Sequence, residues 1–197
     1  MEAVVTIDGR KSRKTPGSRA SELVQVLNSE PDIPTLLPFE VTVGDEVQGV
    51  LAEPTALVAL LRKVERERAW WVGIGLGYAN ELGLTPRVST GPIFIDARIA
   101  VDRAKKLPWG VATESRVWRR AADLERAIAL WVTLLQMRSP RGWETVDLRQ
   151  RGFTELEIAE TLGVTQQAVN QRLRAAFFTQ DEEGAVLINH LLSEVPK

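Results

Sequence analysis

The chain has 197 residues, of which 44% are hydrophobic and 26% charged, a balance typical of a globular protein with one large or two small domains. It contains no cysteine and a single histidine, His190, which excludes disulfides, thiolate metal sites and a histidine metal cluster within the chain. No apolar run has membrane-spanning length and no signal peptide is visible, so we expect a cytoplasmic protein with no membrane partner. The formal net charge is −1, so any affinity for nucleic acid must come from a local surface.

Up to Tyr78, short apolar runs and amphipathic stretches follow one another in the order β-α-β-β-α-β. This order is that of a ferredoxin-like domain, in which the strands lie in the order 4-1-3-2 and strands one and three are antiparallel neighbours. Gly44-Asp45-Glu46 is the turn between the second and third strands, and Ser29–Pro38 is predicted as a loop. The predicted strands are Ala3–Ile7, Phe39–Val43, Val47–Leu51 and Trp70–Tyr78, and the predicted helices run from Ser18 to Asn28 and from Pro54 past Val64.

The remainder of the chain is mostly helical in pattern. Helices are predicted at about Pro92–Lys106, Glu114–Met137 and Trp143–Arg151, with a short strand near Trp109–Ala112. The acidic run 181–184 is predicted to break the chain before a final amphipathic helix. We place a domain boundary near residue 114, which gives a ferredoxin-like domain over 1–113 and an all-α domain over 114–197. The predicted fold class is therefore α+β.

Three glycines, Gly73, Gly75 and Gly77, fall on one face of the fourth predicted strand, because alternate residues of a strand share a face. Bare backbone at these positions allows another element to approach closely. We expect that element to be a helix, with approach of a ligand as the second interpretation.

The stretch Gly152–Ala176 has the pattern of two helices joined by a tight turn. Thr154 is a good N-cap residue, and Glu157 three positions later completes a capping-box pattern. Gly163 follows the apolar positions of the first helix, where a chain leaving a helix favours a residue that tolerates positive φ. Thr165 is a second N-cap candidate. The sequence therefore predicts a helix-turn-helix.

The second helix of this pair carries polar side chains and no acid, which favours contact with double-stranded DNA. Amide groups can bond bidentately to adenine, and guanidinium groups can reach guanine or phosphate. A homodimer is the default assembly, because symmetric sites are read by paired recognition helices. The alternative is an ordinary helical hairpin with a solvated polar face. The predicted DNA-binding residues are Thr165, Gln166, Gln167, Asn170, Gln171, Arg172 and Arg174.

Two acids far apart in the sequence are predicted to meet at one edge of the sheet. Asp8 ends the first strand, and Asp45 lies in the turn that enters the third strand. Paired carboxylates hold Mg²⁺ and a basic, glycine-containing loop holds phosphates, so the pattern suits Mg²⁺ with a nucleotide. The alternative is that both acids are turn residues and the basic run is a solvated loop. The predicted phosphate-binding residues are Arg10, Lys11, Ser12, Arg13 and Lys14.

Several segments together resemble the SatD family of bacterial proteins, which joins such a domain to a C-terminal helix-turn-helix. They are Thr6–Lys14, Val41–Leu51, Trp71–Gly77 and Gly91–Lys106, and the likeness spans most of the chain. The N-terminal part is in turn similar to class III nucleotide cyclases and GGDEF diguanylate cyclases, which carry an acid at the end of strand one and a Gly-Asp hairpin. That likeness implies that Asp8 and Asp45 are the metal-binding acids.

The cyclases also carry an Asn and, four residues on, an Arg on the helix that follows the glycine-rich strand. Ile95 and Ile99 stand at this spacing here, so no transition-state arginine is identified. The helix-turn-helix segment resembles those of sigma-factor region 4 and of response regulators.

These observations favour a DNA-binding transcriptional regulator whose N-terminal domain senses a nucleotide-like ligand or supplies a dimer surface. One alternative is a Mg²⁺-dependent nucleotide cyclase or nucleotidyltransferase that uses Asp8 and Asp45. Another is a bridging module whose helix-turn-helix contacts a second protein.

Overall fold

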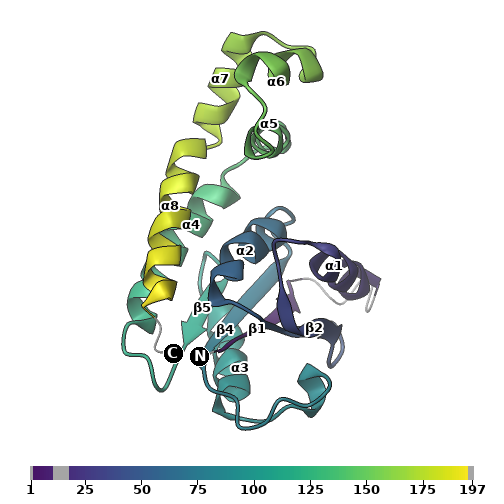
Figure 1. The fold of residues 1–197 in the computed structure, drawn as a ribbon, viewed down its shortest axis with the longest axis vertical. Coiled ribbons are helices and arrows are strands. Elements are labelled where there is room, and N and C mark those ends of the chain that lie inside the picture. The colour runs from purple at the N-terminus through teal and green to yellow at the C-terminus, as the bar shows by residue number, and fades with distance from the viewer. Residues whose placement is uncertain (1, 11–17, 195–197) are drawn as a thin grey trace.

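The computed structural model describes residues 2–10 and 18–194. A sheet and its covering helices form one end of the molecule, and a helical extension rises from it (Figure 1). The strands are β1 (Glu2–Gly9), β2 (Thr35–Val41), β3 (Val47–Leu51), β4 (Trp70–Gly77) and β5 (Val111–Glu114). The helices are α1 (Ser18–Ser29), α2 (Leu57–Glu65), α3 (Pro92–Ala104), α4 (Ala121–Gln136), α5 (Pro140–Gln150), α6 (Glu155–Leu162), α7 (Gln166–Ala175) and α8 (Phe178–Ser193), with short 3-10 turns η2 (Pro54–Ala56) and η3 (Pro86–Val88). The predicted α+β class is confirmed, and none of the described helices is long and apolar enough to cross a membrane.

The five strands form one sheet in the order β2-β3-β1-β4-β5. β1 is antiparallel to both of its neighbours, with Ile7 opposite Val47 on β3 and Val5 opposite Ile74 on β4. β5 adds to the outer edge of β4 in parallel. This register puts the C-terminal end of β1 and the β2–β3 turn at the same end of the strands of the sheet.

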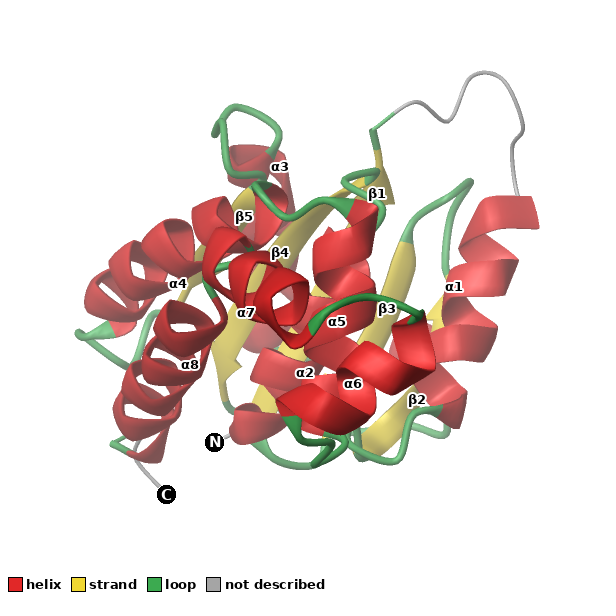
Figure 2. Cartoon of the chain, turned by 90° about the horizontal axis from the view of Figure 1, so that it is seen from above, coloured by secondary structure: helices red, strands yellow, loops and turns green. Residues whose placement is uncertain are grey.

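Each face of the sheet is covered by different helices (Figure 2). Odd-numbered residues of β1, such as Val5 and Ile7, belong to the largest apolar core, which also contains residues of α1, α2, α4 and α8. Even-numbered Val4 lies on the other face, where Ile93 and Ala97 of α3 pack against it. The alternation follows from the period of two in a strand.

The largest core continues across the predicted boundary near residue 114. Leu57 of α2, Trp131 of α4 and Ile188 of α8 all belong to it. The final helix α8 packs along α4 and touches η2, so its apolar face is covered within the chain. Helices α5, α6 and α7 have a separate small core built around Val146, Ile158 and Val169. Whether residues 1–113 and 114–197 are distinct domains stays a prediction.

Three sequence-based predictions of local structure are wrong. The loop predicted over 29–38 is partly strand, because β2 begins at Thr35; Pro38 is tolerated there since β2 is an edge strand with irregular pairing. Glu114 ends β5 rather than beginning a helix, and α4 starts only at Ala121. The acidic run 181–184 lies inside α8, because the Asp181 side chain is buried and paired with arginines.

The expected close approach of a helix to the glycine face of β4 is confirmed. A Cβ atom built on Gly73 would lie 2.1 Å from the backbone nitrogen of Val101, and one on Gly75 would lie 2.3 Å from the carbonyl oxygen of Ile93. Real Cβ atoms do not approach backbone so closely, so α3 can lie on β4 only because these side chains are missing. At Gly77 the nearest atom would be 3.8 Å away, an ordinary contact.

We therefore expect Gly73→Ala to lower the free energy of unfolding by about 2 kcal/mol or more, because α3 must move away from β4. Gly77→Ala is the matched control on the same strand and face, and we expect it to change stability by less than about 1 kcal/mol. Urea denaturation of the two variants measures both values. Equal stability of the two variants would contradict the packing described.

Candidate functional site

Helices α6 and α7 are separated by three residues, Gly163 to Thr165, and each begins with a side-chain cap. The Thr154 hydroxyl accepts a hydrogen bond from the Glu157 N–H, and the Glu157 carboxylate accepts one from the Thr154 N–H at 2.7 Å, so the predicted capping box is confirmed. The hydrogen bonds that the Glu157 carboxylate accepts from the Thr154 N–H and the Thr154 hydroxyl lower the pKa of Glu157 below its usual range. Gly163 has φ +63°, the left-handed conformation expected at this helix end, and Thr165 accepts a hydrogen bond from Ala168.

The small core beneath α7 holds its apolar side chains inward and its polar ones outward. Val169 is fully buried and Leu173 is 7% exposed, and both pack with Ile158 and Ala159 of α6 and Val146 of α5. No other segment within the described residues covers the opposite face of α7, which lies at the end of the molecule away from the sheet (Figure 1). The exposed polar side chains on α7 are Gln166, Gln167, Asn170, Gln171 and Arg174.

Three of the predicted DNA-binding residues make contacts within the chain. Asn170 donates a long hydrogen bond, 3.4 Å, to the Glu155 carboxylate on α6. Arg172 is the half-buried member of the set and lies 4.0 Å from the Glu144 carboxylate on α5. Thr165 serves as the cap. The structure thus brings the predicted residues together on one helix face, and Arg172 is turned toward α5.

A buried ion pair that the sequence analysis did not predict lies where this helical unit joins the rest of the chain. Arg138, which follows α4, donates to the Asp181 carboxylate of α8 at 2.7 Å, and both side chains are at most 1% exposed. Arg138 also donates to the carbonyl oxygen of Ala176 at the end of α7, 2.7 Å away. Burial lowers the pKa of the Arg138 guanidinium, and the Asp181 carboxylate opposes this effect.

Two further elements donate to Asp181. The Trp131 indole N–H of α4 lies 2.8 Å from the same carboxylate, and Arg62 of α2 donates to it through two nitrogens at 2.8 and 3.1 Å. Arg62 reaches Glu182 as well, at 2.8 Å. Arg138 further lies over the Trp143 ring of α5, 4.6 Å from its centroid. One carboxylate therefore ties α2, α4 and α8 together directly beneath α7.

We expect Asp181→Asn to lower the free energy of unfolding by about 3–5 kcal/mol, because it leaves the buried Arg138 charge without its counter-ion. Glu182→Gln is the matched control: it removes the neighbouring, exposed partner of the same Arg62 and costs about 1 kcal/mol or less. Urea denaturation at neutral pH compares them. If Asp181→Asn lowered the free energy of unfolding no more than Glu182→Gln, the buried ion pair would not be what holds these helices together.

A second buried acid, Glu65 at the end of α2, is 1% exposed and accepts a hydrogen bond of 2.7 Å from Gln136 of α4. Burial raises its pKa from 4.5 to about 7, although the hydrogen bond from Gln136 and the charges of Arg10 and Arg68 act in the opposite direction. The folded chain therefore holds this proton more tightly than the unfolded chain. The stabilising contribution is complete below about pH 4.5 and is lost as the pH rises to about 7.

Glu65→Gln should consequently raise the free energy of unfolding at pH 8 by about 3 kcal/mol, since the neutral amide avoids the buried charge. The difference from the wild type should shrink toward zero near pH 4.5. Urea denaturation of both proteins across this range measures it. A difference that stays constant with pH would contradict the buried, protonated acid.

At the predicted metal edge, Asp8 and the β2–β3 turn do lie at the same end of the sheet. The Asp8 carboxylate, however, pairs with Lys105 beyond α3 at 2.7 Å, and Lys105 also contacts Asp102 at 2.9 Å. The hydrogen bond to Asp8 raises the pKa of Lys105 above its usual value, with Asp102 adding to the rise and burial opposing it. One carboxylate oxygen of Asp45 is buried and has no hydrogen-bond partner within the described residues. The role of Asp8 and Asp45 as metal ligands stays a prediction.

Of the predicted phosphate-binding residues, only Arg10 lies within the described part of the chain; Lys11, Ser12, Arg13 and Lys14 lie outside it. The Arg10 guanidinium points back to the sheet edge, where its Nε donates to the Trp70 carbonyl oxygen at 2.7 Å. A second nitrogen lies 3.5 Å from the Trp109 carbonyl oxygen. Phosphate binding by this loop stays a prediction.

In comparisons with known proteins, the chain matches no protein-family model, no curated protein and no solved structure.

Proposed function

We propose that this chain is a DNA-binding transcriptional regulator that reads duplex DNA with α7. The observation that carries the proposal is the uncovered, acid-free face of α7, which presents four amides and an arginine on a helix anchored at both ends. An α-helix with its side chains is about 10–12 Å across and the major groove is roughly 12 Å wide, so a helix with such a face can enter that groove.

The framework around α7 supports the same function. The three-residue turn with its left-handed glycine, and the core shared by α5, α6 and α7, are what a helix-turn-helix requires to hold its second helix against DNA. The acids of α6 lie on the preceding helix, and Glu157 is directed back into the cap by its two hydrogen bonds to Thr154. Phosphate contacts would set the register of the protein, and Gln166, Gln167, Asn170 and Arg174 would contact bases. A homodimer reading a symmetric site is part of this proposal.

The finer assignment of the N-terminal half also remains a proposal. Within the sheet, the strand sequence β4-β1-β3-β2 supports a ferredoxin-like assignment for residues 1–113, and a C-terminal DNA-binding unit is consistent with the SatD resemblance. The alternative of a Mg²⁺-dependent cyclase or nucleotidyltransferase has less support. Lys105 already neutralises Asp8, and Ile95 and Ile99 occupy positions where the cyclases carry Asn and Arg.

The test needs a specific DNA ligand. It is obtained by selecting, from a pool of random-sequence duplexes, those that bind the full chain. We expect the double variant Asn170→Ala, Arg174→Ala to bind the enriched duplex at least about 100-fold more weakly, since each base contact contributes about 1–3 kcal/mol. The control Arg126→Ala also removes one positive charge, but from the exposed face of α4, and should change affinity less than threefold or so. Fluorescence anisotropy at fixed salt gives the affinities, and circular dichroism verifies folding.

Unchanged affinity of the folded double variant would contradict the assignment of α7 as the recognition helix. The wild type could also fail to enrich any duplex and bind DNA only at very low salt. That result would favour a protein partner for the exposed face of α7 instead.

A further inference from the structure

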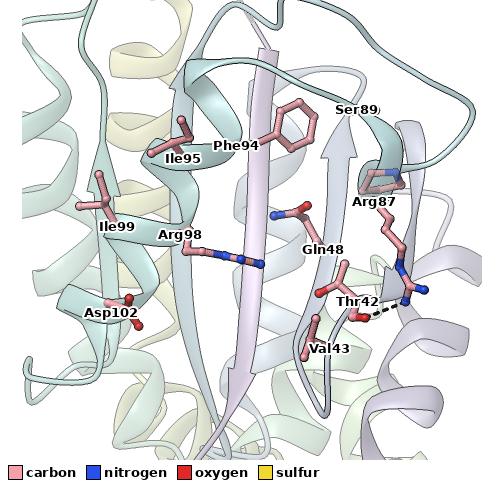
Figure 3. Close-up of a pocket in the computed structure, with 11 residues that line it drawn as sticks. Thr42, Val43, Gln48, Arg87, Ser89, Phe94, Ile95, Arg98, Ile99 and Asp102 are labelled. Atoms are coloured by element: carbon pink, nitrogen blue, oxygen red, sulfur yellow. Dashed lines mark hydrogen bonds between the residues drawn. The ribbon is translucent and has the colours of Figure 1, made fainter.

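A second surface, remote from α7, has the properties of a small-molecule site. It is a groove on the α3 face of the sheet, with a volume of about 650 Å³. Helix α3 packs over β1, β4 and β5, and η3 contacts β2 and β3, so the groove lies between α3 and the η3 segment. In Figure 3, Phe94 and Arg98 of α3 extend toward Gln48 of β3 and the η3 segment, and Ile95 and Ile99 lie on the side of α3 away from Gln48. The volume lies within the range of pockets that hold organic ligands.

Two arginines and one acid, Asp102, line the groove, and the guanidinium of one of the arginines forms no ion pair within the described residues. Arg87 of η3 donates through Nη2 to the carbonyl oxygens of Val41 and Thr42, at 2.7 Å each, and has no ion pair within the described residues. The other arginine, Arg98 of α3, is paired with Glu46 at 2.5 Å. The remaining nitrogens of the Arg87 guanidinium are therefore free to bind an anion, and a planar guanidinium matches carboxylate, sulfonate and phosphate oxygens.

The floor of the groove holds a buried amide with one unused hydrogen-bonding group. Gln48 of β3 is 5% exposed, and its Nε2 donates to the Thr6 hydroxyl at 2.9 Å. This bond fixes the orientation of the amide. Its carbonyl oxygen accepts no hydrogen bond from the described residues, and the amide group points between Phe94 and Arg98 in Figure 3. It is placed to accept a hydrogen bond from a ligand that reaches the floor.

Part of the wall of the groove is apolar. Ile95 and Ile99 are four residues apart on α3 and so share a face, and they are 53% and 42% exposed. Phe94 lies beside them, and Val43 on the opposite rim is 74% exposed. Large aliphatic side chains left exposed around a concave surface are typical of a binding groove.

We propose that this groove binds a small organic anion with an apolar body. The anionic group contacts Arg87, the apolar body lies along Ile95, Ile99 and Phe94, and a donor on the ligand meets the Gln48 carbonyl oxygen. A second copy of the chain is the less suitable occupant. The Arg87 guanidinium and the buried Gln48 amide can each form hydrogen bonds with a small ligand inside the groove, and a flat protein surface would not reach the amide. The proposal goes beyond DNA binding, and its test contains no DNA, so the two can fail separately.

Two fluorescent probes with similar apolar bodies separate the anionic from the apolar contribution. The sulfonate 8-anilinonaphthalene-1-sulfonate carries the charge, and the neutral N-phenyl-1-naphthylamine lacks it. We expect saturable binding of the sulfonate probe to the full chain, weakened about tenfold by Arg87→Gln while binding of the neutral probe changes less than about twofold. Ile99→Glu, at an exposed position that tolerates a charge, should weaken both probes. Arg126→Gln on α4 should weaken neither.

Two results would overturn the proposal. One is sulfonate binding that is unaffected by both Arg87→Gln and Ile99→Glu in proteins whose thermal unfolding matches the wild type, which would place the probe elsewhere. The other is that light scattering shows a dimer for the wild type and a monomer for Ile99→Glu, and that the variant binds the probes more tightly than the wild type. That result would make the groove an interface between two copies.

Discussion

The position of the candidate recognition helix depends on the buried carboxylate of Asp181. This one group accepts hydrogen bonds from Arg62 on α2, Trp131 on α4 and Arg138 after α4. Because Arg138 also donates to the carbonyl oxygen of Ala176, the residue after α7, the ion pair links the end of α7 to the first turn of α8. Burying two charges is favourable only when each is paired and further hydrogen-bonded, so this arrangement tolerates little displacement. A network of this kind specifies one orientation more than it adds stability.

The packing around this ion pair explains why polar contacts orient helices α5 to α7 relative to the sheet. Helices α5 to α7 have a core of their own, and apart from Trp143 they contribute little to the core beneath the sheet. They meet α2 instead through charged groups: Arg66 pairs with Asp147 and lies 4.8 Å from the Trp143 ring centroid. Such contacts are directional but individually weak when exposed. The molecule thus consists of a sheet-based body and a small helical unit, held in a defined relation by α4, α8 and the charges between them.

How far the sequence predicted this structure depended on how local each determinant is. The caps at Thr154 and Thr165 and the left-handed Gly163 were predictable because each involves residues within a few positions of one another. The glycine face of β4 was predictable from the period of a strand. The buried Asp181 was not, since its partners Arg62 and Arg138 are distant in sequence and an acidic run ordinarily indicates solvent. The groove was missed for the same reason: Arg87, Gln48 and Ile99 come from three separate segments, and only the fold brings them together.

The central claim is that α7 is the surface that meets duplex DNA. Hydrogen–deuterium exchange of the full chain, measured with and without an enriched duplex, tests it most directly because it reports on all segments of the chain at once. The account predicts that binding slows exchange over Thr165–Arg174 and the turn before it, and leaves α3 and the groove beside it unchanged. Protection confined to the sheet edge or to α3, with α7 exchanging as in the free protein, would contradict it.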